Sequence, residues 1–307
     1  MTLPDNSPLE MLISSRERDL GGFSVRRILP YMSHRMVGPF VFFDHMGPAD
    51  LAPGEGMDVR PHPHIHLATV SYLFDGAIRH HDSLGSDQVI EPGAINLMTA
   101  GHGIVHSERT PEPQRKAGSR MHGIQCWIAV PTENENGTPS FEHHPSSTLP
   151  EFKIGEGRYK VLMGEIFGRR SPVPLQSDLF YAEIFLPKGE SITIAEKARE
   201  AAVYCVEGRL QQDAIEIGSY TMAILKNGET VRFEALEDSH LMVAGGATLG
   251  PRFLYWNFVS SSEEALEQAK RDWALGPGAT SRFPKIKGDD REFIPLPNDP
   301  PPRGTAM

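Results

Sequence analysis

Four residues in two short segments have the types and the spacing of a metal site. His62 and His64 are one residue apart in RPHPHIH, and His106 and Glu108 are one residue apart in MTAGHGIVHSE. In an extended strand, side chains at positions i and i+2 point to the same face. If two such strands lie opposite each other, three imidazoles and one carboxylate converge. This ligand set suits Fe(II), Mn, Ni, Cu or Zn, and the absence of thiolates disfavours a purely structural zinc site.

Four protein ligands leave open positions on a six-coordinate metal, as the activation of O₂ or of a substrate requires. A single His-x-His pair is weak evidence, because such pairs are common on exposed turns, so the prediction depends on the second pair. His66 continues the same spacing, so a set of His62, His64 and His66 is an alternative; as a non-ligand, His66 would support a ligand or lie at the surface. Glu108 is the only carboxylate in the group and is therefore also the predicted catalytic base.

Two further polar residues could contribute to the same site. His122 and Gln125 occur in HGIQCW, where they could line the interior and hold a ligand ring by a hydrogen bond. The segment His80-His81-Asp82 follows a turn and is interpreted as a solvated hairpin rather than as a set of ligands.

The elements that must position these residues are short strands. Asp75-Gly76 is a hairpin signal after one of them. Many short strands separated by turn residues favour an all-β fold, a barrel or jelly roll. The predicted strands cover residues 23–30, 39–44, 67–74, 94–98, 123–130, 159–163, 179–186 and 202–206.

Two domains are expected. The polar, proline-rich residues 131–150 are interpreted as a connection, and a weak repeat relates residues 68–76 to 201–208 and residues 90–94 to 215–219. The predicted division is a metal-binding barrel over 1–135 and a second barrel without metal over 136–307. The second domain would include a helix at 261–274, capped by serines and ended by Gly276-Pro277, and a proline-rich C-terminal arm.

Composition excludes several classes of function. The net charge of −10 disfavours direct nucleic-acid binding, and two cysteines exclude a disulfide scaffold. No run of apolar residues is long enough for a membrane span and no targeting segment is visible, so we expect a cytoplasmic protein. Twelve of the 13 histidines precede residue 145, which places the chemistry in the first half of the chain.

The same segments resemble a known family. PFVFFDHMGP, PHPHIHLATVSYLFDG, MTAGHGIVHSE, HGIQCWIAVP, WNFVSSS and FPKIKGDDREFIPLP are similar to pirins, from about residue 18 to residue 297. The resemblance implies a bicupin, which consists of two tandem antiparallel β-barrels of the jelly-roll type with one metal site in the N-terminal barrel. It implies that His62, His64, His106 and Glu108 hold one divalent ion, with Fe(II) first and Mn, Ni, Co, Cu or Zn as alternatives.

Two functions follow from this resemblance. The first is an oxidoreductase activity, a quercetin 2,3-dioxygenase that cleaves a small flavonol-like phenolic with O₂. The alternative is a redox-sensitive iron protein that binds a transcription regulator or another protein partner, for which the acidic charge is better suited than for DNA.

The chain departs from the family pattern at positions that bear on the substrate. The glutamate that usually follows the cupin His-x-His is absent, since the corresponding position holds Ala68 or Thr69, so Glu108 must supply the anionic ligand. Many pirins have Arg-Gly-Phe-Glu where this chain has Ile-His-Leu-Ala at 65–68, and His102 occupies a position that often holds a long polar residue. The metal site is therefore expected to be kept, whereas the departures leave the substrate preference open.

Overall fold

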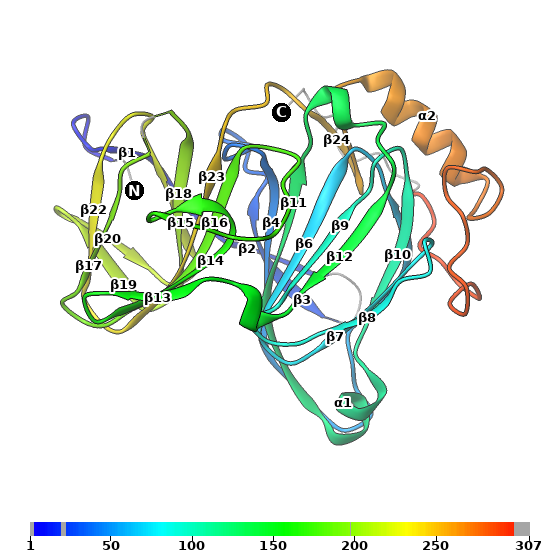
Figure 1. Cartoon of the computed structure of the whole chain (residues 1–307), viewed down its shortest axis with the longest axis horizontal. Helices are drawn as coiled ribbons and strands as arrows, with labels where there is room; N and C mark the ends of the chain where they lie inside the picture. The colour runs from blue at the N-terminus through cyan, green and yellow to red at the C-terminus, as the bar shows by residue number, and fades with distance from the viewer. Residues whose placement is uncertain (1–2, 20–22, 197, 298–307) are drawn as a thin grey trace. The chain divides into compact units, whose positions relative to one another are not determined.

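The computed structural model describes residues 3–19, 23–196 and 198–297, and the chain groups into two compact units (Figure 1). One unit contains residues 19–25, 45–146 and 250–307, and we call it the histidine-rich barrel. The other contains residues 1–18, 26–44 and 147–249, and we call it the histidine-poor barrel. Both are built almost entirely from antiparallel strands, which confirms the predicted all-β fold.

The histidine-rich barrel contains a four-stranded sheet in the order β5-β10-β7-β8. The other strands of this unit belong to a seven-stranded sheet in the order β12-β9-β6-β11-β4-β3-β2, in which residues 16–18, 26–29 and 40–44 group with the histidine-poor barrel. The strands of these two sheets are β2 (Arg16–Asp19), β3 (Ser24–Leu29), β4 (Phe40–Leu51), β5 (Asp58–His64), β6 (Leu67–Asp75), β7 (Ile78–Asp82), β8 (Asp87–Ile90), β9 (Ile95–Thr99), β10 (Ile104–Arg109), β11 (Ser119–Ala129) and β12 (Ser140–His144).

The histidine-poor barrel repeats this arrangement. Its four-stranded sheet has the order β17-β22-β19-β20, and its larger sheet has the order β1-β21-β18-β23-β16-β14-β13, with β15 paired to β14. Its strands are β1 (Leu9–Ser14), β13 (Glu151–Ile154), β14 (Gly157–Ile166), β15 (Arg169–Arg170), β16 (Leu179–Leu186), β17 (Ser191–Ile194), β18 (Glu200–Glu207), β19 (Arg209–Gln212), β20 (Ile215–Gly218), β21 (Thr221–Leu225), β22 (Val231–Ala235) and β23 (Ser239–Gly246).

The internal repeat is visible in the strand orders. The series β5-β10-β7-β8 and β9-β6-β11-β4 in the histidine-rich barrel correspond to β17-β22-β19-β20 and β21-β18-β23-β16 in the histidine-poor barrel. The sequence pairs that suggested a repeat lie on β6 and β18 and at β8 and β20, as this correspondence requires. Two units of one topology explain why similar turn signals recur about 130 residues apart.

The domain boundaries differ from those expected at residues 135 and 136. Strand β1 belongs to the histidine-poor barrel because its backbone pairs with β21, from Leu9 opposite Leu225 to Ser14 opposite Thr221. Residues from 250 onward group with the histidine-rich barrel. Pairings between residues far apart in the chain decide both assignments, and local sequence composition does not reveal them.

Residues 131–150 are also more ordered than a connection. They contain two short 3₁₀ turns, Thr132–Asn134 and Ser146–Thr148, and β12, which pairs with β9 from Ser140 opposite Thr99 to His144 opposite Ile95. Prolines and polar residues are compatible with an edge strand, and β12 lies at the edge of its sheet.

The Asp75-Gly76 turn does not form a hairpin. Strand β6 pairs with β9 and β11, whereas β7 pairs with β10 and β8, so the turn takes the chain from one sheet to the other. Gly76 has a φ of +87°, and a Cβ there would lie 2.2 Å from the carbonyl oxygen of Arg120. The turn signal was therefore correct, but the partner of the next strand was not.

Two helices complete the described part of the chain, and neither is long and apolar enough to cross a membrane. Helix α1 (Glu112–Ala117) was not predicted. Helix α2 (Glu263–Ala274) confirms the helix expected at 261–274, and the side chain of Ser262 caps it by accepting a hydrogen bond from the Ala265 N–H. The hairpin of β24 (Phe253–Tyr255) and β25 (Phe258–Ser260) precedes α2.

A buried polar network ties residue 135 to the region before α2. Glu135 accepts hydrogen bonds from the backbone N–H of Ser261 at 2.7 Å and from the Ser261 hydroxyl at 2.9 Å. The Nδ1 of His66 lies 3.3 Å from the same carboxylate, and the Nε of Arg252 lies 3.4 Å from it. Burial disfavours the charged carboxylate, but the hydrogen bonds from His66 and Ser261 outweigh burial and hold the pKa of Glu135 below 4.5.

We predict that Glu135→Gln destabilises the protein in a pH-dependent way. A carboxyl whose pKa is lower in the folded state contributes stability above its unfolded pKa and loses it as the pH falls through the folded value. Urea unfolding at about pH 7 should show a loss of about 3 kcal/mol, because the buried guanidinium of Arg252 loses the charge of its partner. The difference from wild type should shrink as the pH falls below about 4.5. Glu133→Gln, an exposed acid two residues away, is the control; a pH-independent loss, or an equal loss in the control, would contradict the prediction.

Candidate metal centre

The candidate ligands lie on β5 and β10, which are neighbouring antiparallel strands. His62 is directly opposite His106, and His64 is directly opposite Ile104. Strand β5 is the edge strand of its sheet and, in the described part of the chain, pairs only with β10. Proline lacks a backbone N–H, so the two prolines that alternate with the histidines are tolerated in a strand that has a neighbour on one side only. The sequence RPHPH is therefore compatible with a strand at this place and aims both rings to one side.

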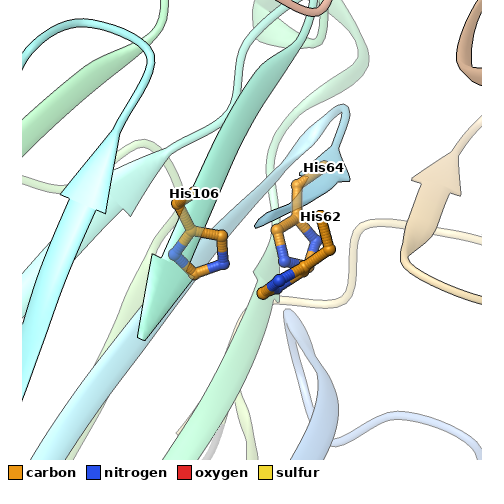
Figure 2. Close-up of side chains that lie close together, drawn as sticks. All are labelled: His62, His64 and His106. Carbon is orange, nitrogen blue, oxygen red and sulfur yellow. The ribbon is translucent and has the colours of Figure 1, made fainter. Parts of the chain in front are cut away.

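Three imidazole rings converge at this pair of strands (Figure 2). His62, His64 and His106 each offer a nitrogen atom, and these atoms lie within 4.8 Å of one another. The ring centroids are 4.3 Å apart for His62 and His106 and 5.0 Å apart for the other two pairs. All three side chains are buried. The group has the composition and spacing of a three-histidine metal site.

The Nδ1 atom of each ring faces an outer partner. The Nδ1 of His62 lies 2.9 Å from the carbonyl oxygen of Arg60, and the Nδ1 of His64 lies 2.9 Å from the carbonyl oxygen of Asn257. A carbonyl oxygen only accepts, so both rings donate through Nδ1 and keep the lone pair on Nε2. Outer partners of this kind fix the tautomer and the orientation of metal-binding histidines.

His106 has a different outer partner. Its Nδ1 lies 3.4 Å from the Nδ1 of His80, and the Nε2 of His80 lies 3.0 Å from a carboxylate oxygen of Asp82. The Nε2 of His106 is buried and, among the residues that the structure describes, has no hydrogen-bond partner. Buried polar atoms are normally paired. A metal ion bound at this nitrogen would supply the missing partner, so the residues fit the ion that the sequence predicts.

Burial lowers the pKa of all three rings. The pKa of His64 and that of His106 fall well below 6.5, first because burial disfavours the charged imidazolium and then because the neighbouring rings repel a proton. Burial also lowers the pKa of His62, although the Arg60 carbonyl and the charge of Glu108 oppose this effect. The free rings are therefore neutral near pH 7, which is the form that binds a metal.

Glu108 is buried beside these rings, but it is not part of the close group of three nitrogen donors. Its two carboxylate oxygens each lie 2.8 Å from the side-chain nitrogen of Gln125, and the Ser71 hydroxyl donates to one of them at 3.2 Å. A bulge separates the two positions on β10, since His106 is opposite His62 whereas Glu108 is opposite Val59. The structure thus places the carboxylate near His62 without showing it as a ligand, so its ligand role stays a prediction.

The alternative set that included His66 is not supported. Strand β5 ends at His64, and His66 has a φ of +58°, which takes its side chain off the face shared by His62 and His64. The Nδ1 of His66 lies 3.0 Å from the Ser260 hydroxyl, within the Glu135 network. His102 is exposed and its Nδ1 faces the Gly137 carbonyl oxygen at 3.2 Å.

The other predicted supporting residues have separate roles. Gln125 holds Glu108, as described. His122 lies with its Nε2 2.8 Å from the Nε2 of His45 and its ring stacked on that ring. Among the described residues, neither His122 nor His45 belongs to the group that could hold a metal.

Residues 80–82 lie in a hairpin as expected, since β7 pairs with the next strand β8, but the interpretation of His80 and Asp82 as solvated was wrong. His80 and Asp82 are buried on β7, next to β10, and they support His106. The i, i+2 spacing of a histidine and a carboxylate was the signal that could have identified them. The contact between the His64 ring and the Asn257 carbonyl had no such signal, because every residue type has a backbone carbonyl.

Comparisons with known proteins agree with this geometry. The Pirin family model matches residues 22–128, and the model of the pirin C-terminal cupin domain matches residues 181–278. A pirin-like protein of Caulobacter vibrioides is 48% identical over 292 residues, which cover 94% of this chain and 99% of that protein.

Solved structures show the same fold. A crystal structure of quercetin 2,3-dioxygenase from Acinetobacter baumannii has a TM-score of 0.88 and 32% sequence identity, and the match covers 96% of this chain and 97% of that one. The bacterial pirin YhhW from Escherichia coli, solved in complex with nickel(II), has a TM-score of 0.61 and 17% identity over 78% of this chain and 99% of that one. With two barrels of one topology and three buried histidines on adjacent strands of one of them, the chain belongs to the pirin family and is a bicupin.

Proposed function

We propose that the protein is a metal-dependent dioxygenase that opens the ring of a flavonol-like phenolic with O₂. The observation that carries the proposal is the group of three buried histidines, whose Nδ1 atoms have outer partners and whose Nε2 atoms remain for a metal. The similarity to the Acinetobacter quercetin 2,3-dioxygenase supports the choice of reaction. In that reaction both atoms of O₂ enter the products and one ring carbon leaves as CO, so no external reductant is needed.

His62, His64 and His106 would hold one divalent ion, which we propose to be Fe(II). A bound ion would supply a Lewis acid and a template for a phenolate oxygen and O₂. Three neutral imidazoles do not cancel its charge, so the site would favour an anionic oxygen. Mn, Ni, Co, Cu and Zn accept the same ligands, and the order of affinity among these ions does not by itself select iron.

We propose two roles for Glu108, as a fourth ligand and as the base that takes the proton of the flavonol hydroxyl. Gln125 and Ser71 donate hydrogen bonds to its carboxylate, which limits the rotation of the side chain. A carboxylate held in this way can accept a proton at one oxygen while the other oxygen keeps its hydrogen bond. Gln125 is then a positioning residue, since it acts through Glu108.

The activity is tested by anaerobic reconstitution. Metal-free protein is loaded with Fe(II), Mn(II), Ni(II), Co(II) or Cu(II) in separate samples, and quercetin is added before air. At least one metal should give a loss of the flavonol absorption with release of CO. If every sample binds its metal and none consumes quercetin, the enzymatic proposal fails for this substrate, although the metal site stands.

His106→Ala should abolish metal retention. Removing one of three ligands leaves two imidazoles, which hold a divalent ion far more weakly, so we expect less than a tenth of the wild-type metal content after dialysis, measured by elemental analysis. His102→Ala, at an exposed histidine, is the matched control and should retain wild-type content. Full retention in His106→Ala would show that the metal binds elsewhere.

Glu108→Gln should separate chemistry from metal binding. The amide keeps the shape of the side chain but cannot take up the substrate proton, so turnover should fall by about 10²- to 10⁴-fold. The three histidines should still retain metal, with a lower affinity from the loss of one anionic donor. Glu112→Gln, on the exposed face of α1, is the control for the change of charge. Wild-type turnover in Glu108→Gln would remove both proposed roles.

A further inference from the structure

The two ligand strands have a second face, opposite to the one that carries the histidines. Residues 250–296, which we call the C-terminal strap, contact this face. In Figure 1, α2 and the red segment that follows it lie beside β10. Three kinds of contact join the strap to β5 and β10, and each involves a residue next to a candidate ligand.

The first contact is apolar. Ile65, next to His64, and Val105, next to His106, belong to one buried cluster with residues of the strap. Ile65 also forms a parallel bridge with Phe258 on β25. The strap residues buried in this cluster are Phe258, Leu266, Ala269, Trp273, Phe283 and Ile286. The burial of these apolar side chains stabilises the packing of the strap against Ile65 and Val105.

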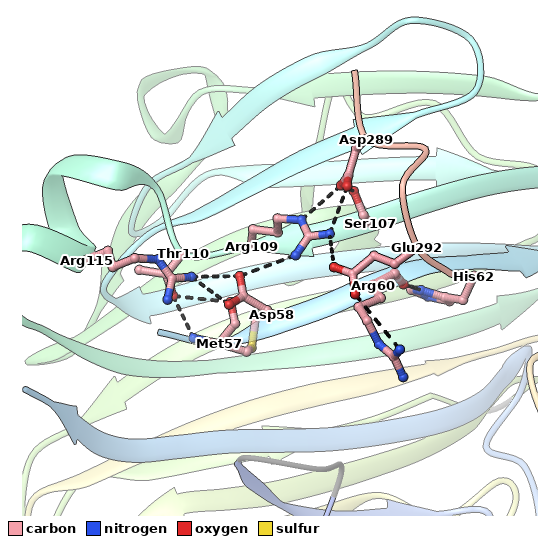
Figure 3. Close-up of polar contacts among 10 residues, drawn as sticks. All are labelled: Met57, Asp58, Arg60, His62, Ser107, Arg109, Thr110, Arg115, Asp289 and Glu292. Carbon is pink, nitrogen blue, oxygen red and sulfur yellow. Dashed lines mark hydrogen bonds and ion pairs between the residues drawn. The ribbon is translucent and has the colours of Figure 1, made fainter. Parts of the chain in front are cut away.

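The second contact is charged and reaches β10 between His106 and Glu108 (Figure 3). The Ser107 hydroxyl donates to Asp289 at 2.7 Å, and Arg109 donates to both oxygens of the same carboxylate at 2.9 and 2.8 Å. Arg109 also donates to Glu292 at 3.1 Å. Burial opposes the charged form of Asp289, but the bonds from Arg109 and Ser107 hold the pKa of this carboxyl below its ordinary value. A bidentate pair of this kind fixes both distance and angle.

The third contact reaches β5 at two places, the backbone of Pro61 and the ring of His64. The backbone N–H of Ile294 donates to the carbonyl oxygen of Pro61 at 2.8 Å, and the Trp273 indole N–H donates to the Ile294 carbonyl at 3.0 Å. The Asn257 carbonyl is the partner of the His64 ring.

The turn of the β24–β25 hairpin explains the position of this carbonyl. Trp256 and Asn257 are the two residues between the strands, and Trp256 has a φ of +53°. Two-residue hairpin turns require this left-handed conformation, which is unfavourable for a large side chain. The conformation leaves the Asn257 carbonyl outside the two-stranded ladder and directed at His64.

We propose that the C-terminal strap is part of the metal centre, as a positioning element that acts through Asn257 on His64 and through Asp289 on the β10 segment between His106 and Glu108. The inference rests on the metal site of the proposed function but not on the substrate or the reaction. Although residues 250–296 supply no candidate ligand, they determine how closely the three rings match the geometry of a metal ion. Outer contacts of ligands affect metal affinity by about 10- to 100-fold.

The first experiment measures the affinity of metal-free protein for Ni(II) and Mn(II) by competition with a chromophoric chelator. Asp289→Ala should weaken both affinities by about tenfold or more. Asp290→Ala removes the same charge from the adjacent, exposed position of the strap and should stay within twofold of wild type. Asp289→Glu, which restores the carboxylate, should recover part of the loss. A general effect of charge would change both alanine variants alike.

The second experiment uses the unchanged protein, so it does not depend on the folding of a variant. Because linkage is reciprocal, a strap that raises metal affinity must itself be stabilised by bound metal. Hydrogen exchange of wild type with and without Ni(II) should show slower exchange in peptides that contain residues 253–260 and 289–294. Peptides from β19 and β20 of the histidine-poor barrel serve as the internal control and should not change.

The outcomes separate this inference from the proposed function. If wild type binds no metal, the proposed metal site is wrong and the strap has nothing to position. If wild type binds metal while Asp289→Ala binds it equally well, or while the strap peptides exchange at the same rate with and without metal, the strap inference is wrong and the metal site stands.

Discussion

The structure depends on the burial of three imidazole rings with their nitrogen atoms within 4.8 Å of one another. A buried polar atom without a partner costs about 1–3 kcal/mol, and the Nε2 of His106 is such an atom. The protein limits this cost by satisfying the other nitrogen of each ring and by keeping the rings neutral. What remains is a set of aligned lone pairs, which is unfavourable in isolation and favourable around a cation. The arrangement that costs free energy without a cation is therefore one that could hold a metal ion.

The histidine-poor barrel has the same strand order but no buried histidines at the corresponding pair of strands. In the histidine-rich barrel His62 is opposite His106, and the corresponding strands β17 and β22 place Ile192 opposite Phe233. Ile192, Ile194 and Phe233 are buried in the apolar core of their barrel. One topology thus supports two interiors, one held by hydrophobic contacts and one that carries polar rings. At this pair of positions the difference is one of side chains and not of strand pairing.

The sequence was most informative where the physics is local. The i, i+2 spacing of His62 and His64 predicted their shared face, the serines before residue 263 predicted the start of α2, and turn residues predicted the ends of several strands. Several wrong or missing predictions concern pairings between segments that are far apart in the chain: β1 with β21, the sheet that β7 joins after Gly76, and the support of His106 by His80. The contact between Asn257 and His64 is made by a backbone oxygen, which every residue type has, so the amino-acid sequence could not predict it.

The contact between His64 and Asn257 has a consequence for biosynthesis. The two residues are 193 positions apart, and Asp289 follows Asn257 by a further 32 positions. A ribosome adds residues from the N-terminus, so all three histidines are made long before the residues that hold their strands from behind. If the C-terminal strap raises metal affinity as proposed, a nascent chain that stops before Asn257 carries all three histidines but lacks the contacts that position them.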